Sequence, residues 1–127
     1  MDAADWEKLK RQGDEAIQRW IDKQLGGTSV TAVLIGAETF YRKWVNYEIK
    51  KSHERGNGLL GVYIQHIKNQ GGYDDWKGDN PFDKFYIDRD GKKVSLSEIY
   101  PTYDWVNDDG YNNFGNWVEK AAKKAGR

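Results

Sequence analysis

Glu48 and Trp44 are a candidate catalytic pair, four residues apart in the segment Lys-Trp-Val-Asn-Tyr-Glu-Ile at residues 43–49. On a helix, residues four apart lie on the same face, one turn apart. The Trp44 indole would then wall a site beside Glu48 and limit water access, which strengthens the interaction between a carboxylate and a positive charge. The alternative is structural: a solvent-facing Glu48 paired with Lys51 or Ser52, and a Trp44 that anchors the core. Residue types alone favour the structural alternative for Glu48, since exposed glutamates are routine on helices.

A second candidate position is the turn Gly36-Ala37, directly after an apolar segment. Gly36 has no side chain, so a ligand could approach its backbone closely, and the alternative is a plain turn. No metal site is expected, because His53 and His66 are isolated and lack HExxH spacing. The acidic residues between positions 74 and 83 lack calcium-loop spacing, and no glycine-rich phosphate loop precedes a helix.

Alternating helices and strands position these candidates. Apolar residues recur at helical spacing in residues 14–25, 39–55 and 112–125, and each segment predicts a helix with one buried face. Nearly continuous apolar runs at 29–35 and 59–64 predict strands covered on both faces, which is typical of a parallel sheet. Strand, helix and strand in this order indicate a crossover unit, whose ligand site is expected at the carboxyl ends of the strands.

The remaining segments carry weaker signals. Residues 1–13 are polar and predict a lead-in. Residues 82–87 and 93–99 flank the turn sequence Asp-Arg-Asp-Gly, and they predict one or two further strands beyond the strand at 59–64. We therefore expect one α/β domain over residues 1–127, with three layers and a parallel sheet flanked by helices.

One edge of this predicted sheet is left unfilled. The strand at residues 29–35 reads as an interior strand, which requires a neighbour on each side. The strand at residues 59–64 is its neighbour on one side, and the later strands would all lie beyond that neighbour. We therefore expect the N-terminal strand of the sheet to be missing, and its place to be filled by residues before Met1 or by another chain.

Composition limits the classes of partner and compartment. The chain has 127 residues, with 20 Lys plus Arg and 20 Asp plus Glu, so no net charge attracts nucleic acid or an anionic membrane over distance. No apolar run approaches the roughly 20 residues of a membrane helix. Cysteine is absent, which excludes disulfides and thiolate metal sites. We expect a cytoplasmic protein that binds neither nucleic acid nor membrane.

Several short segments together resemble a known family. They are Trp20-Ile21-Asp22, Gln24-Leu25, Thr31 to Gly36, Lys43 to Ile49, Gly58 to Ile64 and Asn80-Pro81-Phe82. This set resembles the TIR-like family first recognised as a flavodoxin-like domain in archaea and found in the Thoeris antiviral system. The most specific part is the Trp44-x-x-x-Glu48 element on a helix directly after a buried strand. Family members begin with a hydrophobic strand, and this is the strand expected to be missing.

The resemblance implies cleavage of the nicotinamide–ribose bond of NAD+, with hydrolysis or cyclisation of ADP-ribose to give a nucleotide signal in antiphage defence. That reaction builds positive charge on the ribose, and a nearby carboxylate stabilises it. Glu48 is therefore the predicted catalytic residue. The predicted nucleotide-binding residues are Gly36, Ala37, Trp44, Asn46 and Tyr47. NAD+ would be the substrate, with no cofactor and no metal.

The alternative function is a non-catalytic TIR-like module for self-association or protein interaction. TIR-type folds also act by self-association, and an unfilled sheet edge invites pairing. A homo-oligomer joined through the strand at residues 30–35 is therefore expected. Receiver and flavin-binding functions are disfavoured, because the early strand ends that would carry their phospho-accepting or phosphate-binding residues are absent.

Overall fold

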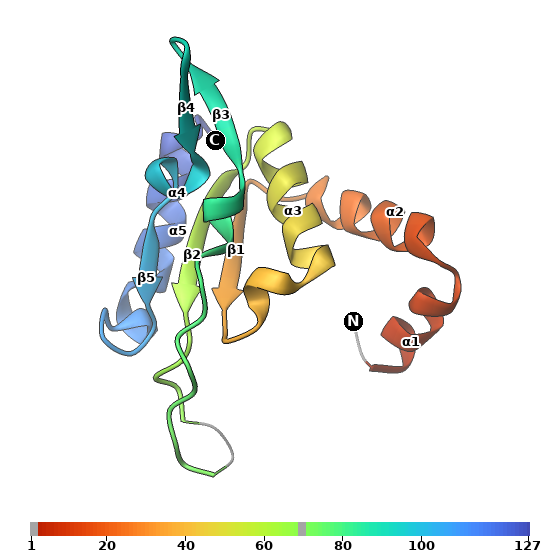
Figure 1. Cartoon of the computed structure of the whole chain (residues 1–127), viewed down its shortest axis with the longest axis horizontal. Helices are drawn as coiled ribbons and strands as arrows, with labels where there is room; N and C mark the ends of the chain where they lie inside the picture. The colour runs from red at the N-terminus through yellow and green to blue at the C-terminus, as the bar shows by residue number, and fades with distance from the viewer. Residues whose placement is uncertain (1–2, 69–70) are drawn as a thin grey trace.

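The computed structural model describes residues 3–68 and 71–127, with the backbone alone described for residues 3–6. Two helices precede the first strand, and after it helices alternate with strands except for one hairpin (Figure 1). The helices are α1 (Ala3–Arg11), α2 (Asp14–Leu25), α3 (Lys43–Glu54), α4 (Leu96–Ile99) and α5 (Gly110–Lys124). The strands are β1 (Val30–Ile35), β2 (Gly58–Tyr63), β3 (Tyr86–Arg89), β4 (Lys92–Ser95) and β5 (Thr102–Asp104). Short 3-10 helices at Thr39–Tyr41 and Pro81–Lys84 precede α3 and β3.

A three-stranded parallel sheet in the order β1-β2-β5 forms the centre of the domain. β1 and β2 pair along their whole length, from Val30 opposite Gly58 to Ile35 opposite Tyr63. α3 connects these two strands. The predicted α/β class with a parallel sheet flanked by helices is therefore confirmed.

β5 completes the sheet on the far side of β2, and its place depends on Gly61. The Gly61 N–H donates a hydrogen bond of 3.0 Å to the carbonyl of Pro101. A Cβ on Gly61 would lie 2.7 Å from Ile35 Cδ1 of β1 and 3.0 Å from Thr102 Cγ2 of β5, so a side chain would displace those of both neighbouring strands. The sequence does not predict β5, because its three residues are too few for a recognisable alternation of apolar and polar positions.

Helices cover both faces of the sheet and give three layers (Figure 1). α3 covers one face, where the buried cluster consists of Val33, Ile35, Ile49, Leu59, Phe82 and Leu96. α5 covers the opposite face, where the cluster consists of Leu60, Val62, Trp117 and Ala121. On that face the rings of Tyr103 and Trp117 stack with centroids 4.2 Å apart.

α2 packs on α3 through a third apolar cluster. Its buried members are Ile17, Ile21 and Leu25, and Trp44 and Tyr47 of α3 pack against them. This cluster also receives Leu9 of α1, a helix that stands where the sequence predicts a polar lead-in. Residues 1 and 2 of that predicted lead-in lie outside the described residues.

The two segments expected to extend the parallel sheet form a separate antiparallel hairpin. β3 and β4 pair with each other and with no other described strand. Asp90 and Gly91 have φ angles of 55° and 78°, the mirror-image turn favoured in tight hairpins. The predicted turn is confirmed, but the predicted place of these strands beyond β2 is wrong. β5 occupies that place, and the hairpin satisfies its own hydrogen bonds.

β1 forms an edge of the sheet and pairs with β2 alone among the described strands. The described residues contain no strand before β1, in agreement with the edge predicted to be unfilled. Leu34 on this strand is 57% exposed. β1 is therefore an edge strand in this structure, although its apolar run is typical of an interior one.

α3 begins later than its apolar spacing predicts. Residues 39–41 form a 3-10 helix, and Arg42 is extended, with φ −82° and ψ 116°. The Thr39 hydroxyl stabilises this break, because it accepts a hydrogen bond from the Gly36 N–H at 2.8 Å and donates one to the Leu34 carbonyl at 3.3 Å. Residues before Lys43 therefore belong to the turn that follows β1.

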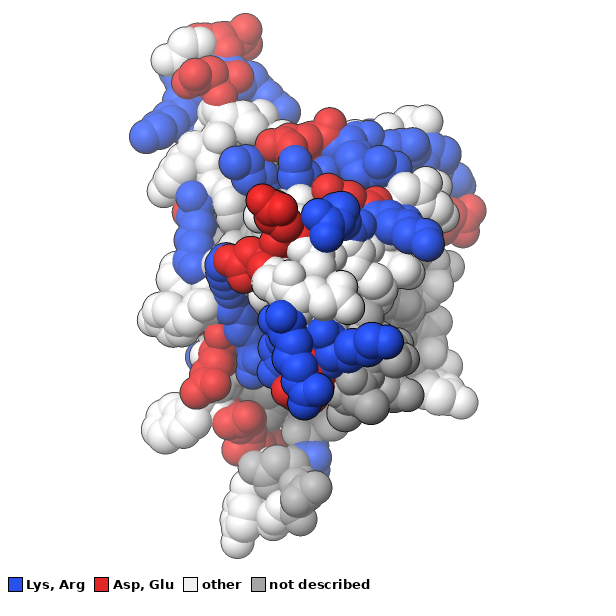
Figure 2. Space-filling view, turned by 90° about the vertical axis from the view of Figure 1, so that its right-hand side faces the viewer, with Lys and Arg blue, Asp and Glu red and all other residues white. Residues whose placement is uncertain are grey.

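The surface is charged without one dominant sign. Figure 2 shows basic and acidic side chains interspersed over the face that includes α1 and α2, as the equal numbers of both kinds in the sequence suggest. None of the described helices has both the length and the apolar character needed to cross a membrane.

Candidate active site

Glu48 lies near the middle of α3, about 7.5 Å along the helix axis from Lys43, the first residue of the helix. Its side chain is half-buried. Helix geometry places it between the face that packs on α2, which carries Trp44, and the face that packs on the sheet, which carries Ile49. Figure 1 shows α2 beyond α3, on the side of β1 away from β2.

The two partners that the structural alternative offers to Glu48 are engaged elsewhere. The Lys51 ammonium lies 3.6 Å from a carboxylate oxygen of Glu54. The Ser52 hydroxyl shares a buried hydrogen bond of 2.8 Å with the Thr31 hydroxyl of β1. Within residues 3–68 and 71–127, the Glu48 side chain makes no hydrogen bond and no ion pair. A partly desolvated carboxylate costs folding free energy, and neither of the two expected partners offsets that cost.

Burial raises the pKa of the Glu48 carboxyl above its ordinary value. The cause is desolvation, which disfavours the charged form of an acid. Perturbed carboxyl groups that lack a structural partner are concentrated at functional sites. Glu48 is therefore a half-buried carboxylate with a raised pKa, on a helix that packs on the sheet.

Trp44 and Tyr47 attach α3 to α2. Trp44 packs against the cluster built on Ile17 and Ile21, and the two aromatic rings meet edge-on with centroids 5.9 Å apart. The Tyr47 hydroxyl donates a hydrogen bond of 2.9 Å to Asp22, and desolvation together with this acceptor raises the pKa of Tyr47. Trp44 is thus a packing anchor that also flanks Glu48, one helical turn away.

Asn46 lies on a different side of α3 from Glu48. Two residues along a helix correspond to a rotation of about 200°, so their side chains point in nearly opposite directions. The Asn46 amide donates a hydrogen bond of 3.3 Å to the Phe40 carbonyl, and its buried side-chain oxygen has no partner among the described residues. The structure therefore does not bring Asn46 together with Glu48, although a free buried acceptor would suit a ligand donor.

The turn Gly36-Ala37 is covered by the chain itself. Gly78, in the segment between β2 and β3, packs so closely that a Cβ on it would lie 2.0 Å from the Gly36 carbonyl oxygen and 3.3 Å from Ala37 Cα. Gly78 of the chain itself thus occupies the space beside the Gly36 backbone, and the approach of a ligand to Gly36 stays a prediction. A Cβ on Gly36 itself would meet only ordinary contacts, the nearest at 3.6 Å from Ile64.

Polar residues after β2 and β5 were not among the predicted site residues. Gln65 is 7% exposed, its amide donates a hydrogen bond of 3.2 Å to Asp104, and its side-chain oxygen is buried without a partner among the described residues. His66 lies 2.8 Å from Asp74 and 3.7 Å from Asp104. Lys68 and His66 lower the pKa of Asp74. A polar residue directly after a buried strand is the sequence signal for this cluster.

A cavity of about 590 Å³ lies at the opposite end of the sheet, where the parallel strands begin. Its walls include Gly58 at the start of β2 and Pro101 just before β5. None of the six predicted site residues lines it. In the described part of the chain, no three His, Asp or Glu side chains converge as a metal-ligand cluster.

The fold and the site define a class of protein: a three-layer α/β domain whose first crossover helix carries a half-buried carboxylate, without a side-chain partner among the described residues, beside an anchoring tryptophan. Comparison with known proteins agrees with this class. The family model described as "Thoeris protein ThsB, TIR-like domain" matches residues 1–69, which contain α1 to β2 and all six predicted site residues. The chain belongs to this family.

A relative from Bacillus cereus (strain MSX-D12) extends the similarity to most of the chain. It is named "Putative cyclic ADP-D-ribose synthase ThsB1" and is 39% identical over 153 residues. The aligned region covers 92% of this chain and 80% of the relative. The family resemblance read from the sequence is therefore confirmed.

Proposed function

We propose that this chain cleaves the nicotinamide–ribose bond of NAD+ and converts the ADP-ribose part to a nucleotide signal in antiphage defence. Membership of the Thoeris ThsB family and the synthase name of its Bacillus cereus relative support the proposal. The observation that carries it is Glu48, a half-buried carboxylate with no partner among the described residues, in the part of the chain that the family model matches.

The proposed reaction breaks the bond between the ribose C1′ and the nicotinamide nitrogen, and the electron pair leaves with neutral nicotinamide. Positive charge then develops on the ribose. Either water or a nucleophilic atom of the same ADP-ribose adds to C1′ and loses a proton, which gives a linear or a cyclic product. The ionised Glu48 carboxylate would stabilise the developing cation, and limited water access would strengthen that interaction. One carboxylate suffices, so the proposal includes no metal and no cofactor.

The remaining predicted residues enter the proposal with different roles. Trp44 would hold α3 against α2 and thereby fix the position of Glu48. Tyr47 neighbours both, and its hydroxyl is already bonded to Asp22. The free oxygen of Asn46 would accept a hydrogen bond from a ligand on the other side of α3. Gly36 and Ala37 would contact a nucleotide only if the segment around Gly78 moves away from them.

Glu48→Gln tests the catalytic role, because it removes the charge and keeps the shape. NAD+ turnover by the purified chain is followed by chromatography, which also identifies the product. We expect the variant to lose turnover by roughly 10²- to 10³-fold, the usual cost of removing one electrostatic contact to a transition state. Equal turnover in both proteins would refute the assignment of Glu48.

Glu54→Gln is the matched control. Glu54 lies on the same helix, in its last turn, and forms an exposed pair with Lys51. Loss of such a pair has little effect on stability. Turnover should therefore stay within about twofold of the unmodified chain, since surface changes of this kind cost less than about 0.5 kcal/mol.

Self-association is the second candidate function, and the open edge of β1 favours it. The backbone groups on one side of β1 face no described strand, and Leu34 on the same strand is 57% exposed. Such an edge is a template for pairing with another chain. Light scattering of the unmodified chain would then give a dimer or larger species, and Leu34→Lys would shift it toward monomer. A monomer at all concentrations would exclude this function.

A further inference from the structure

The cavity of about 590 Å³ is formed where several elements meet at the beginning of the sheet. Buried Asn57, Leu59 and Ala121 belong to its lining. The β3–β4 hairpin contributes Arg89, and the last turns of α5 contribute the remaining cations. Its volume lies within the range typical of sites for small organic ligands.

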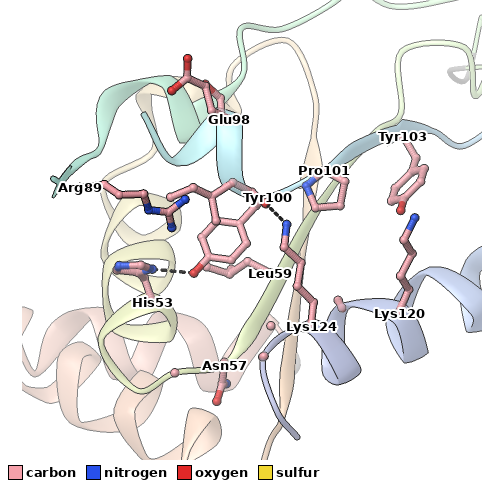
Figure 3. Close-up of a pocket in the computed structure, with 16 residues that line it drawn as sticks. His53, Asn57, Leu59, Arg89, Glu98, Tyr100, Pro101, Tyr103, Lys120 and Lys124 are labelled. Atoms are coloured by element: carbon pink, nitrogen blue, oxygen red, sulfur yellow. Dashed lines mark hydrogen bonds between the residues drawn. The ribbon is translucent and has the colours of Figure 1, made fainter. Parts of the chain in front are cut away.

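The lining carries an excess of positive charge on a chain with no net charge. Three permanent cations, Arg89, Lys120 and Lys124, face one acid, Glu98. Figure 3 shows the Arg89 guanidinium and the Lys124 ammonium on either side of Tyr100, whereas the Glu98 carboxylate points away from the other labelled side chains.

No acidic side chain among the described residues pairs with any of these three cations. Within those residues, the Arg89 and Lys120 side chains make no hydrogen bond and no ion pair. Lys124 donates a hydrogen bond to the Ile99 carbonyl, which leaves its charge uncompensated. Like charges brought to one cavity repel each other, and an anion placed between them relieves that repulsion.

The same cavity also presents aromatic and apolar surface. Tyr100 is held by a hydrogen bond of 2.6 Å between its hydroxyl and His53, and Tyr103 is held by its stack on Trp117. Figure 3 shows the Tyr103 and Lys120 side chains pointing toward each other. Preordered rings beside cations suit a ligand that combines a flat apolar part with phosphate groups.

We propose that this cavity binds a small phosphorylated ligand of nucleotide size, with two or more negative charges, at a site separate from Glu48. The two sites lie on different parts of the fold: the cavity uses the beginnings of β2 and β5, and Glu48 lies in the middle of α3. The proposal does not depend on NAD+ cleavage.

Binding of ADP to the intact chain tests the proposal, with adenosine as the probe that lacks phosphate. Calorimetry at low salt gives the affinity, and amide NMR shifts locate the ligand. ADP should shift the amides of Gly58 and Ala125 in the cavity, and adenosine should bind at least tenfold more weakly. Adenosine binding as tight as that of ADP, or shifts confined to residues around Glu48, would overturn the proposal.

Two lysines on α5 give a matched pair of variants. Lys120 lines the cavity, whereas Lys123 lies outside it in an exposed pair with Glu119. Lys120→Ala should weaken ADP binding about three- to tenfold, and Lys123→Ala should leave it unchanged. Arg89→Ala on the hairpin should repeat the effect of Lys120→Ala from the other wall. Equal affinity in Lys120→Ala, Arg89→Ala and the unmodified chain would refute the site.

Glu48→Gln separates this proposal from the proposed catalytic function. The variant should bind ADP in the cavity with unchanged affinity, whether or not the chain turns over NAD+. Loss of the cavity shifts in Glu48→Gln would show that the ligand sits at the Glu48 site, and the inference of a second site would then fail.

Discussion

Replacement of Glu48 by Gln should stabilise the fold at neutral pH while it removes the proposed activity. The native state holds this carboxylate half-buried and without a partner among the described residues, whereas the unfolded chain exposes it to water. Burial therefore raises the pKa of Glu48 in the native state above that in the unfolded state. Gln has almost the same shape and no charge to desolvate, so the native state gains from the change.

The sign of the pH dependence follows from proton linkage. Below the ordinary Glu pKa, both states of the unmodified chain are protonated and the variant has no advantage. As pH rises from that value through the raised native pKa, the unmodified chain loses stability, because its unfolded state ionises first. Above the native pKa the difference is complete and constant.

The size of the effect is modest, because part of the carboxylate remains solvated. We expect a gain of roughly 0.5–1 kcal/mol at pH 7, at the lower end of what single stabilising substitutions give, because solvent screens part of the charge. For a domain of this length, this corresponds to an increase in Tm of about 2–5 °C. Urea unfolding at several pH values between 4 and 8 measures it directly.

Glu54→Gln provides the control for this experiment. Its carboxylate pairs with Lys51 at 3.6 Å, so removal of the charge should give no gain that grows with pH. If Glu48→Gln shows the same difference from the unmodified chain at pH 4 and pH 7, or is less stable at pH 7, the carboxylate is solvated or paired. The reasoning for a desolvated Glu48 would then be wrong.

Two further predictions concern the contacts around the site. Gly78→Ala should destabilise the fold by about 2 kcal/mol or more in chemical unfolding, because its Cβ would lie 2.0 Å from the Gly36 carbonyl oxygen and backbone would have to move; an unchanged midpoint would mean that the segment carrying Gly78 does not rest on this turn. Ser52→Ala should cost about 1–3 kcal/mol, since it leaves the buried Thr31 hydroxyl without its partner; the double variant with Thr31→Val should recover most of that loss, and an equally unstable double variant would contradict the assignment of the loss to this bond.

The sequence determined the elements whose signals are local. Apolar spacing in α2 and α5 and the continuous apolar runs of β1 and β2 follow from which residue types favour each burial pattern, and the structure has all four elements. The Asp90-Gly91 turn was likewise predictable, because few residues adopt positive φ angles easily. The family resemblance also rested on local segments, and Glu48 lies on the helix that the sequence predicts after the first strand.

Tertiary structure alone decided which of these residues meet. β5 has three residues, and only its pairing across Gly61 makes it a strand. Whether Glu48 is paired depends on the partners of the Lys51 and Ser52 side chains. Lys51 pairs with Glu54, and Ser52 forms a long-range hydrogen bond with Thr31. The cationic cavity brings together Arg89 and Lys120, which are more than 30 positions apart in the sequence. No local sequence pattern predicts that these two residues line one cavity. Local preferences specify single elements, whereas contacts between elements depend on how the whole chain buries its apolar surface.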